Sequence, residues 1–443
     1  MKTYYIETYG CQMNVADSEL VAGLLKQSGY TPTNSEADAN AIFLNTCAIR
    51  EHAEDKIHSR LGTLKKLKKE RPEILIGILG CMAQHVKDDI LYNKSYVDFV
   101  LGPDSYRHLP SLLKRQEYKR DSIVDTRLSK FEVYENLFPS RKEGVNAWVS
   151  IMRGCDKFCT FCIVPFTRGR ERSRNLKSII EEVEQAVDEG FLEITLLGQN
   201  VNSYESNKTR FPELLNSISE IKGVKRIRFT SPHPKDINDE MLFVMRDKSN
   251  ICNSVHLPLQ AGSDRILKKM NRTYTKSEFI HLAEHIRNVL PNCGLSTDII
   301  AGFPSETDKD FEDTLDVMEQ IIFDSAFTFK YSPRPGTKAT EYSNHISEKV
   351  KDDRLQKLIK LQQSHTIKRN EKEISKVVKV LVEKNSKKSN QQWAGRTDAN
   401  KWVIFPKKDT QIGDFVNVKI VDARGISLFG ELDEKKEISS AII

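Results

Sequence analysis

Apolar and polar positions along the first third of the chain predict short strands separated by helices. Residues 17–27 and 52–70 repeat their apolar positions with the period of an α-helix. Four short apolar runs are typical of strands: TYYIETY, AIFLNT, ILIGILG and YVDFVLG. Because strand–helix alternation is typical of a parallel sheet covered by helices, we predict a parallel α/β sheet domain over residues 1–118.

The alternation resumes after a polar stretch and then continues for about 190 residues. The polar stretch, SKFEVYENLFPSRKEG at 129–144, is expected to hold few buried groups and to mark a boundary within a linker over 119–146. Six strand candidates follow: WVSIMRG, EITLLGQN, RIRFTSPHP, SVHLPLQAG, LSTDIIAGF and SAFTFKYS. Helical patterns cover 178–189, 212–221, 239–246, 276–290 and 308–322. We therefore predict a partial (β/α) barrel of about six strands over 147–373, short of the eight of a full barrel.

The last part of the chain changes to an all-β pattern after a helix that ends near Lys372. Its strand candidates are KVVKVLVEK, WAGRTDANKWVIF, DFVNVKIVDA and GISLFGEL, with turns expected at Gly395, Gly413 and Gly425. This pattern predicts a small β-barrel over 374–437.

Positive charge is concentrated next to this predicted barrel. Residues 351–408 carry sixteen Lys and Arg against six Asp and Glu, a net +10, whereas the whole chain is only +6. A basic barrel with Trp393, Trp402 and Phe405 can bind phosphates and stack bases, so we predict an RNA-binding domain. A solvated lysine-rich surface is the alternative.

Composition excludes several classes of protein. Twenty Phe, thirteen Tyr and three Trp among 443 residues are enough to build cores, which excludes disorder throughout the chain. A membrane span needs about 20 consecutive apolar residues, and the sequence holds no such run. The start, MKTYYIETYGC, lacks the basic-then-apolar pattern of a secretory signal. We therefore expect a cytoplasmic protein that does not bind membranes.

Eight cysteines in a protein of that compartment suggest metal binding or catalysis before disulfides. Cys11, Cys47 and Cys81 each follow a predicted strand directly, at intervals of about 35 residues. Because parallel strands end at one edge of a sheet, we expect these thiols to converge there, although three separate buried thiols remain the alternative. Cys252 and Cys293 have no partner pattern and are interpreted as small buried apolar residues.

The remaining three cysteines, Cys155, Cys159 and Cys162, form a C-x-x-x-C-x-x-C run just after the first barrel strand. Structural zinc usually takes four protein ligands, and no fourth candidate lies nearby. A 4Fe-4S cluster held by three thiolates leaves one iron open for a substrate or cofactor. We therefore predict an iron–sulfur cluster at the mouth of the barrel, with structural zinc as the alternative.

The wider sequence resembles a known family. GCDKFCTFC after a barrel-opening strand resembles the signature of radical S-adenosylmethionine (SAM) enzymes. ETYGCQMNVADSE, NTCAIRE, ILGCMAQ, RGCDKFCTFCIVPFTRGRERSR, LLGQNVNSY, RFTSPHP, LPLQAGSDRIL, DIIAGFPSET and GRTDANKWVIF resemble the radical SAM methylthiotransferases over nearly the whole chain. The resemblance implies an N-terminal methylthiotransferase domain, a radical SAM barrel and a C-terminal TRAM domain.

The resemblance also implies roles for individual residues. Cys155, Cys159 and Cys162 would ligate the 4Fe-4S cluster that binds SAM. Cys11, Cys47 and Cys81 would hold a second, auxiliary 4Fe-4S cluster that carries the sulfur to be transferred. Contacts to SAM would come from Phe161, Gly198, Gln199, Asn200, Gln260, Ser296, Asp298 and Gly302. The Gly-Gly-Glu that related enzymes place at the methionine amino group is absent here, where Gly198, Gln199 and Asn200 stand.

The function that the resemblance implies is methylthiolation of a tRNA base. The expected substrate is dimethylallyl-adenosine beside the anticodon, modified at the adenine ring with two SAM molecules. The expected partners are the tRNA anticodon stem-loop and an electron donor such as flavodoxin or ferredoxin, and the expected state is a monomer. Within the family, the alternatives are threonylcarbamoyl-adenosine in tRNA and an aspartate of a ribosomal protein. A non-catalytic, zinc-stabilised RNA-binding protein is a further alternative.

Basic residues near the barrel mouth and in the C-terminal domain are candidates for RNA contact. The predicted set is Arg168, Arg170, Arg172, Arg174, Lys387, Lys388, Arg396 and Lys401. For the four arginines, which closely follow the last cysteine of the run, the alternative is a solvated surface at the start of a helix.

Overall fold

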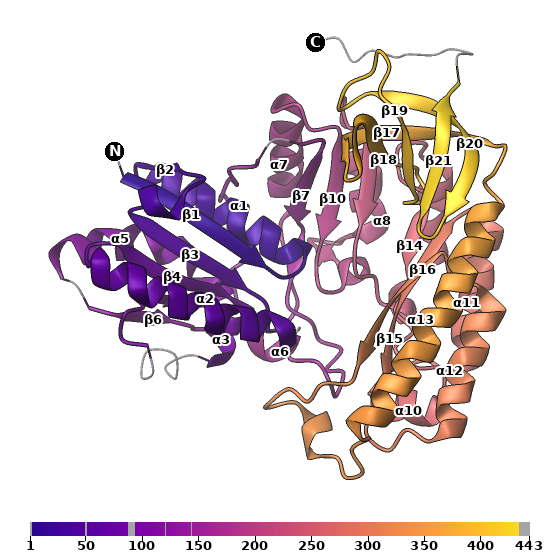
Figure 1. Cartoon of the computed structure of the whole chain (residues 1–443), viewed down its shortest axis with the longest axis horizontal. Coiled ribbons are helices and arrows are strands. Elements are labelled where there is room, and N and C mark those ends of the chain that lie inside the picture. Colours follow the sequence, from indigo (N-terminus) through magenta and orange to yellow (C-terminus); the bar gives the residue numbers. More distant parts are fainter. Residues whose placement is uncertain (1, 49–50, 87–93, 120, 143, 434–443) are drawn as a thin grey trace.

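The computed structural model describes residues 2–48, 51–86, 94–119, 121–142 and 144–433. Its three parts are the N-terminal sheet at one side, the barrel at the centre and a small β-barrel at the far end (Figure 1). Among the described residues, no helix is long and apolar enough to cross a membrane.

The N-terminal part is a six-stranded parallel sheet in the order β2-β1-β3-β4-β5-β6. The strands are β1 (Lys2–Tyr9), β2 (Tyr30–Pro32), β3 (Ala41–Thr46), β4 (Leu75–Gly80), β5 (Phe99–Leu101) and β6 (Ile123–Asp125). The helices are α1 (Gln12–Gln27), α2 (Glu51–Glu70), α3 (Cys81–Val86) and α5 (Leu109–Tyr118), with short 3-10 turns η1 (Glu36–Asp38) and η2 (Pro103–His108). Successive residues of β3 point to opposite faces, so Phe43 packs on the side of α1 and α5, and Leu44 on the side of α2.

Few of the described residues at 129–144 are buried, as expected, but Tyr134 among them is firmly packed. Tyr134 is buried, and its hydroxyl donates to Pro103 O at 2.9 Å. The guanidinium of Arg153 lies 3.6 Å from the centre of its ring. Strand β6 also lies within the predicted linker and pairs with β5. The polar pattern of the stretch gave no sign of these contacts, because a single aromatic ring has no periodic signal.

The central part is a half-open barrel of parallel strands with helices outside. Its main strands are β7 (Asn146–Ser150), β10 (Glu193–Leu197), β13 (Arg226–Phe229), β14 (Ser254–His256), β15 (Gly294–Ala301) and β16 (Ser325–Lys330). They form two three-stranded sheets, in the orders β13-β10-β7 and β14-β15-β16, and a bridge from Ile227 to Ile251 joins the two. The predicted partial barrel of six strands is confirmed.

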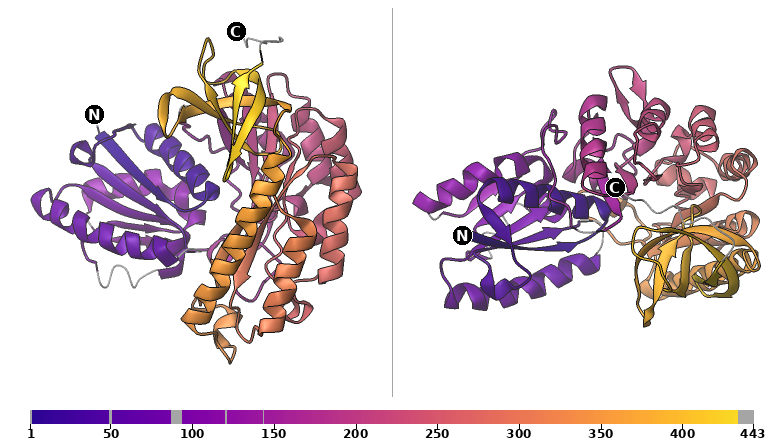
Figure 2. Two further views of the ribbon diagram at one scale, coloured as in Figure 1. Left: turned by 45° about the vertical axis from the view of Figure 1, so that its right-hand side comes forward. Right: turned by 90° about the horizontal axis from the view of Figure 1, so that it is seen from above.

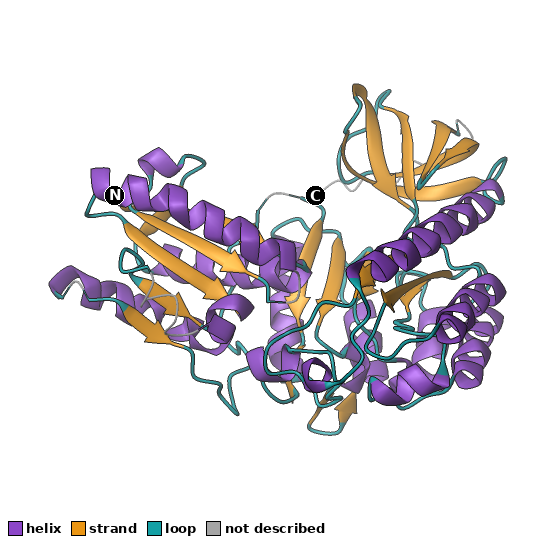
Figure 3. Ribbon diagram, turned by 60° about the horizontal axis from the view of Figure 1, so that its bottom comes forward, coloured by secondary structure: helices purple, strands orange, loops and turns teal. Residues whose placement is uncertain are grey.

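The other elements of this part complete the barrel wall and rim. The helices are α6 (Val164–Thr167), α7 (Leu176–Asp188), α8 (Phe211–Ser219), α9 (Asp239–Asp247), α10 (Asp264–Lys269), α11 (Lys276–Val289), α12 (Asp308–Ile321) and α13 (Glu348–Glu371). Two short antiparallel pairs lie in loops: β8 (Met152–Arg153) with β9 (Arg172–Ser173), and β11 (Glu205–Ser206) with β12 (Thr209–Arg210). The 3-10 turns η3 (Val201–Ser203), η4 (Pro234–Asp236) and η5 (Lys338–Glu341) lie in loops too. Figure 3 shows the helices gathered outside the strands.

The C-terminal part is a closed five-stranded barrel in the order β17-β18-β19-β21-β20. The strands are β17 (Val377–Ser386), β18 (Ser389–Arg396), β19 (Trp402–Pro406), β20 (Phe415–Arg424) and β21 (Ser427–Leu432). Gly395, expected at a turn, lies inside β18. A Cβ on this glycine would meet Leu381 O at 2.1 Å, so the close approach of two strands explains the residue.

This small barrel is fixed against the barrel of α/β units by buried arginines. Arg226 Nη1 donates to Arg396 O at 2.6 Å, and Arg228 Nη2 donates to Thr397 O at 2.8 Å. Glu193, fully buried, pairs with Arg228 at 2.9 Å and with Arg396 at 3.1 Å. The small barrel therefore sits at the amino ends of the central strands. It lies above them in Figure 1 and in the left panel of Figure 2.

Candidate active site

Three strand ends bring Cys11, Cys47 and Cys81, called the N-terminal thiols below, to one edge of the first sheet. Tyr9 of β1 lies beside Thr46 of β3, and Thr46 lies beside Gly80 of β4. Cys11 caps the amino end of α1, Cys47 follows β3, and Cys81 begins α3. Gly80 has a φ of +93°, and a Cβ there would meet Thr46 O at 2.5 Å. The tight turn before Cys81 thus requires glycine.

The environment of these thiols favours a charged sulfur at Cys11. A hydrogen bond with Cys47 lowers the pKa of Cys11 to about 6, and the charge of Arg168 and the backbone N–H groups of Asn14 and Met13 act in the same direction. Burial raises the pKa of Cys81, which Arg168 opposes. A thiolate stabilised by N–H donors and a buried cation is the form that binds iron.

Arg168 connects the two halves of the site. It follows α6 in the barrel, six residues after Cys162, yet its Nε donates to Cys81 Sγ at 3.1 Å. Its Nη2 forms an ion pair with Asp17 of α1 at 2.6 Å, and both side chains are buried. The carboxyl edge of the first sheet and the mouth of the barrel therefore face each other.

The loop between β8 and α6 holds Cys155, Cys159 and Cys162, called the barrel thiols below. Burial raises the pKa of Cys155 to about 11 and that of Cys162 to about 12. Backbone N–H groups of Lys157 and Val164 donate to the sulfurs of these two residues. Arg272 adds a cation, because its Nη1 donates to Cys159 Sγ at 3.3 Å.

Both trios offer thiols, which are the usual protein ligands of an iron–sulfur cluster. All six cysteines are free thiols. Among the residues that the structure describes, no three His, Cys, Asp or Glu converge on a single metal ion. An iron–sulfur cluster does not need three side chains around a single ion, because each of its irons binds its own thiolate. Arg168 Nη1 is buried beside Cys81 without a hydrogen-bond partner in the described part of the chain, so a donor is available there for a sulfide.

The residues predicted to contact SAM lie at several strand ends around the barrel. Gln199 Oε1 accepts the Gly154 N–H at 2.6 Å and so supports the cluster loop. Asn200 is buried and donates to Asp236 at 2.8 Å. Gly198 abuts Met152, whose Cγ would lie 2.6 Å from an added Cβ. These contacts give Gln199 and Asn200 internal partners in this structure.

The other predicted SAM contacts lie on the second half of the barrel. Ser296 Oγ and Asp298 Oδ2 bind the two ring nitrogens of His256, at 2.9 and 3.2 Å. Gln260, whose backbone has a φ of +68°, donates its N–H to Asp298 O at 2.8 Å. Gly302 has a φ of +76° and directly follows β15. Phe161 packs edge-on against Phe303, with ring centres 6.5 Å apart.

Three of the four arginines expected to contact RNA are buried, and for them that prediction is wrong. Arg168 pairs with Asp17, Arg172 with Asp104 at 2.9 Å, and Arg174 with Glu182. The side chain of Arg170 is 70% exposed and pairs with Asp156 at 2.6 Å. The sequence of alternating arginines does not indicate which carboxylates they pair with, because Asp17 and Asp104 belong to the N-terminal sheet domain.

The residues of the C-terminal domain that are predicted to contact RNA also divide into paired and exposed ones. Arg396 and Lys401 are partly buried and bind the central barrel, Lys401 through Asp324 at 2.7 Å, so both side chains already have partners within the chain. Lys387 and Lys388 are exposed at the turn between β17 and β18.

Two residues of the site escaped sequence analysis. Arg272 has no fixed spacing to the cysteines, so no pattern indicates it. Asp17 does carry a signal, since an acid on the apolar face of a helix beside Leu20, Val21 and Leu24 needs a cation.

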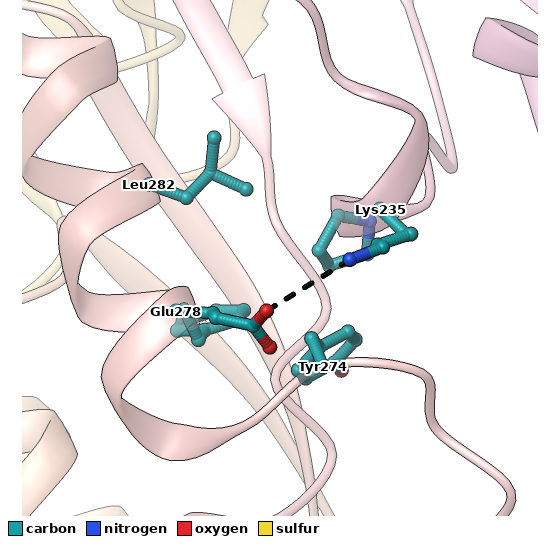
Figure 4. A pocket seen from close by; sticks show the side chains of 6 residues that line it. Lys235, Tyr274, Glu278 and Leu282 are labelled. Carbon is teal, nitrogen blue, oxygen red and sulfur yellow. Dashed lines mark ion pairs between the residues drawn. The ribbon is translucent and has the colours of Figure 1, made fainter.

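A shallow cavity of about 200 Å³ lies elsewhere on the rim. Pro234, Lys235, Tyr274, Glu278, Phe279 and Leu282 line it. Figure 4 shows Lys235 facing Glu278 across it, at 3.9 Å. None of the six cysteines lines this cavity, but Tyr274 in its wall accepts a hydrogen bond from Arg272, which contacts Cys159.

Comparisons with known proteins agree with this division into parts. Residues 3–102 match the model described as "Uncharacterized protein family UPF0004", 149–318 match the radical SAM superfamily and 371–432 match the TRAM domain. Solved structures with a similar fold include the radical SAM methyltransferase TsrM from Kitasatospora setae (TM-score 0.56, 12% identity, 74% of this chain and 73% of that one). Another is the cobalamin-dependent radical SAM enzyme OxsB (TM-score 0.55, 13% identity, 82% and 56%).

The fold and the thiols define a radical SAM enzyme with a TRAM domain, and the predicted fold class is confirmed. A radical SAM domain implies a 4Fe-4S cluster and SAM. Curated relatives named tRNA-2-methylthio-N(6)-dimethylallyladenosine synthase are 46% identical in Chloroherpeton thalassium (96% of this chain, 95% of that one) and 47% in Bacteroides thetaiotaomicron (97% and 96%). The chain belongs to this family of radical SAM methylthiotransferases, as its motifs predicted.

Proposed function

We propose that the protein transfers a methylthio group to the adenine ring of dimethylallyl-adenosine beside the anticodon of tRNA. It would use SAM and two 4Fe-4S clusters, one on each trio of thiols. The names of the relatives that match almost the full length of the chain support the substrate. The basic TRAM domain supports an RNA partner.

One observation carries the proposal of two clusters. Arg168 joins Cys81 at the edge of the first sheet to the loop that ends with Cys162 in the barrel. Two separate trios of thiols therefore open toward one another. A single radical-generating cluster needs only the barrel thiols, so the second trio has a separate task, which we assign to sulfur donation.

Each set of residues has a stated part in the reaction. The clusters and SAM supply electron transfer, a carbon radical and sulfur when bound, which side-chain acid–base catalysis cannot supply at an inert C–H bond. Arg272 and the N–H groups of Lys157 and Val164 stabilise the negative charge of the barrel thiols. Arg168 does the same at Cys81. Cys47 and Cys81 are buried and the other four thiols are partly buried, which limits the access of water to both trios.

The test separates the two trios. Cys11, Cys47 and Cys81 are replaced together by Ala, and the protein is reconstituted with iron and sulfide under anaerobic conditions. We expect iron to fall from about eight to about four atoms per chain, because each cubane holds four. SAM cleavage persists, whereas mass spectrometry of tRNA nucleosides finds no methylthio product.

The control variant replaces Cys252 and Cys293, which are buried thiols outside both trios. It keeps the full iron content and the product. A triple variant that still methylthiolates tRNA would falsify the role assigned to the N-terminal thiols. For the substrate, tRNA from a strain lacking the protein is expected to lose the methylthio group on dimethylallyl-adenosine and to keep every other modification.

A further inference from the structure

Strand β16 carries two large apolar side chains that are not covered. Phe327 is 55% exposed and Phe329 is 39% exposed. The strand is the last of its sheet and pairs with β15. Two exposed phenylalanines at alternate positions of one strand form an apolar wall on one face of the sheet.

The direction of these side chains follows from their neighbours. Lys330 pairs with Glu348 at 3.1 Å and Asp352 at 2.9 Å, both on α13. Even-numbered residues of β16 therefore face α13, and odd-numbered residues face the inside of the barrel. Phe327 lies beside Asp298 of β15, and Phe329 beside Ile300, whose side chains are partly exposed on the same inner face.

The apolar wall formed by Phe327 and Phe329 packs against His256. The ring of His256 meets that of Phe327 edge-on, with centres 6.1 Å apart. Ser296 holds one ring nitrogen and Asp298 the other. Because both ring nitrogens of His256 have partners, the orientation of the ring is fixed, and Phe327 packs against it.

The two ends of β16 connect the TRAM domain to the barrel thiols. Asp324, just before the strand, pairs with Lys401 of the TRAM domain at 2.7 Å. Tyr331, just after the strand, packs on Phe303 with ring centres 5.3 Å apart, and Phe303 packs on Phe161 of the cluster loop. The strand therefore runs from a contact with the TRAM domain toward the loop of the barrel thiols.

We propose that Phe327 and Phe329 form the wall against which the alkylated adenine base packs, and that this wall selects for the dimethylallyl group. This assignment rests on the proposed function and names the residues that would give it specificity. A flat ring stacks on an aromatic face, and a branched alkene of five carbons gains most from an apolar wall. The wall lies on a strand whose two ends contact the TRAM domain and the aromatic residues beside the barrel thiols, which favours an RNA base over other apolar ligands.

The test uses two anticodon stem-loop RNAs that differ only in the dimethylallyl group. Binding to the reconstituted full-length protein is measured by fluorescence anisotropy, and methylthiolation is measured by mass spectrometry. Wild type is expected to prefer the alkylated RNA by at least about tenfold, the range that apolar contacts of this size provide. Phe327→Ala and Phe329→Ala are expected to reduce the preference to within about twofold, and binding of the plain RNA is expected to weaken less than that of the alkylated RNA, because it loses only the stacking of the adenine ring.

Two controls define the outcome. Phe243→Ala removes a phenylalanine of similar exposure on α9 and is expected to keep the preference. Phe327→Tyr retains an aromatic face and is expected to keep it too. SAM cleavage without RNA is expected to be equal in all these variants. The proposal is overturned if Phe327→Ala and Phe329→Ala keep the wild-type preference, or if they lose SAM cleavage instead, which would make the wall part of the SAM site. If wild type methylthiolates neither RNA, the proposed function itself fails.

Discussion

Arg168 offers the clearest test of how the two domains are joined. Its ion pair with Asp17 has side chains that are 3% and 1% exposed, with 2.6 Å between the charged atoms. Arg168→Met keeps the length of the side chain but leaves the Asp17 carboxylate buried without its cation. Removing one partner of a buried pair costs about 3–5 kcal/mol, because the remaining charge has lost both water and its counter-ion.

The matched control is Arg170, two residues away. Its pair with Asp156 is exposed, so Arg170→Met is expected to cost at most about 1 kcal/mol. Thermal unfolding of the reconstituted proteins, followed by circular dichroism, is expected to give a much lower midpoint for Arg168→Met than for Arg170→Met. The double variant Arg168→Met/Asp17→Asn is expected to recover much of the loss, because a neutral amide needs no counter-ion.

Binding of tRNA is expected to respond to the loss of Arg170 and not to the loss of Arg168, the reverse of the effect on stability. Arg168 is covered by Asp17 and Cys81, so its loss leaves the salt dependence of tRNA binding unchanged. Arg170 is the exposed member, and its loss is expected to reduce the slope of log affinity against log salt by about one if it contacts a phosphate. Equal melting midpoints for the two variants, or a reduced slope for Arg168→Met, would refute the assignment of Arg168 to the domain interface.

Three further predictions concern other buried charges. Burial raises the pKa of Glu19 from 4.5 to about 7, so the folded state loses stability as the pH rises from 4.5 to 7. Glu19→Gln is therefore expected to raise the melting midpoint at pH 8 and to have little effect at pH 4. Arg272→Gln removes a cation from Cys159 and is expected to lower the reduction potential of the barrel cluster in a redox titration, because the reduced cluster is the more negative form. Arg228→Ala leaves Glu193 with one cation fewer and breaks a bond to Thr397 O, so limited proteolysis between α13 and β17 should become faster than in wild type.

Sequence patterns predicted the sheet, the barrel and the six clustered cysteines because local periodicity and strand ends carry that information. Cys47 directly after an apolar run marks a strand end whatever the tertiary structure, and parallel pairing then brings such ends together. The motif of Cys155 is local as well, since its ligands lie within eight residues.

The partners of the arginines could not be predicted because they depend on how domains pack. Arg172 meets Asp104, a residue 68 positions earlier, and Arg396 meets Glu193, which is 203 positions away. A charged residue in a polar segment looks solvated until its partner is known. Tyr134 was missed for the same reason, since a single ring in a polar run gives no periodic signal.

The arrangement of the parts restricts the form that the substrate can take. The TRAM domain sits at the amino ends of the barrel strands, whereas the thiols lie at the carboxyl ends. Strand β16 has six residues and so spans about 20 Å between them. A base that stays stacked within a duplex cannot travel that far from the bound backbone, but a base in a loop can be turned outward. The geometry therefore favours a single-stranded loop, in which Phe327 replaces the stacking partner that the base leaves behind.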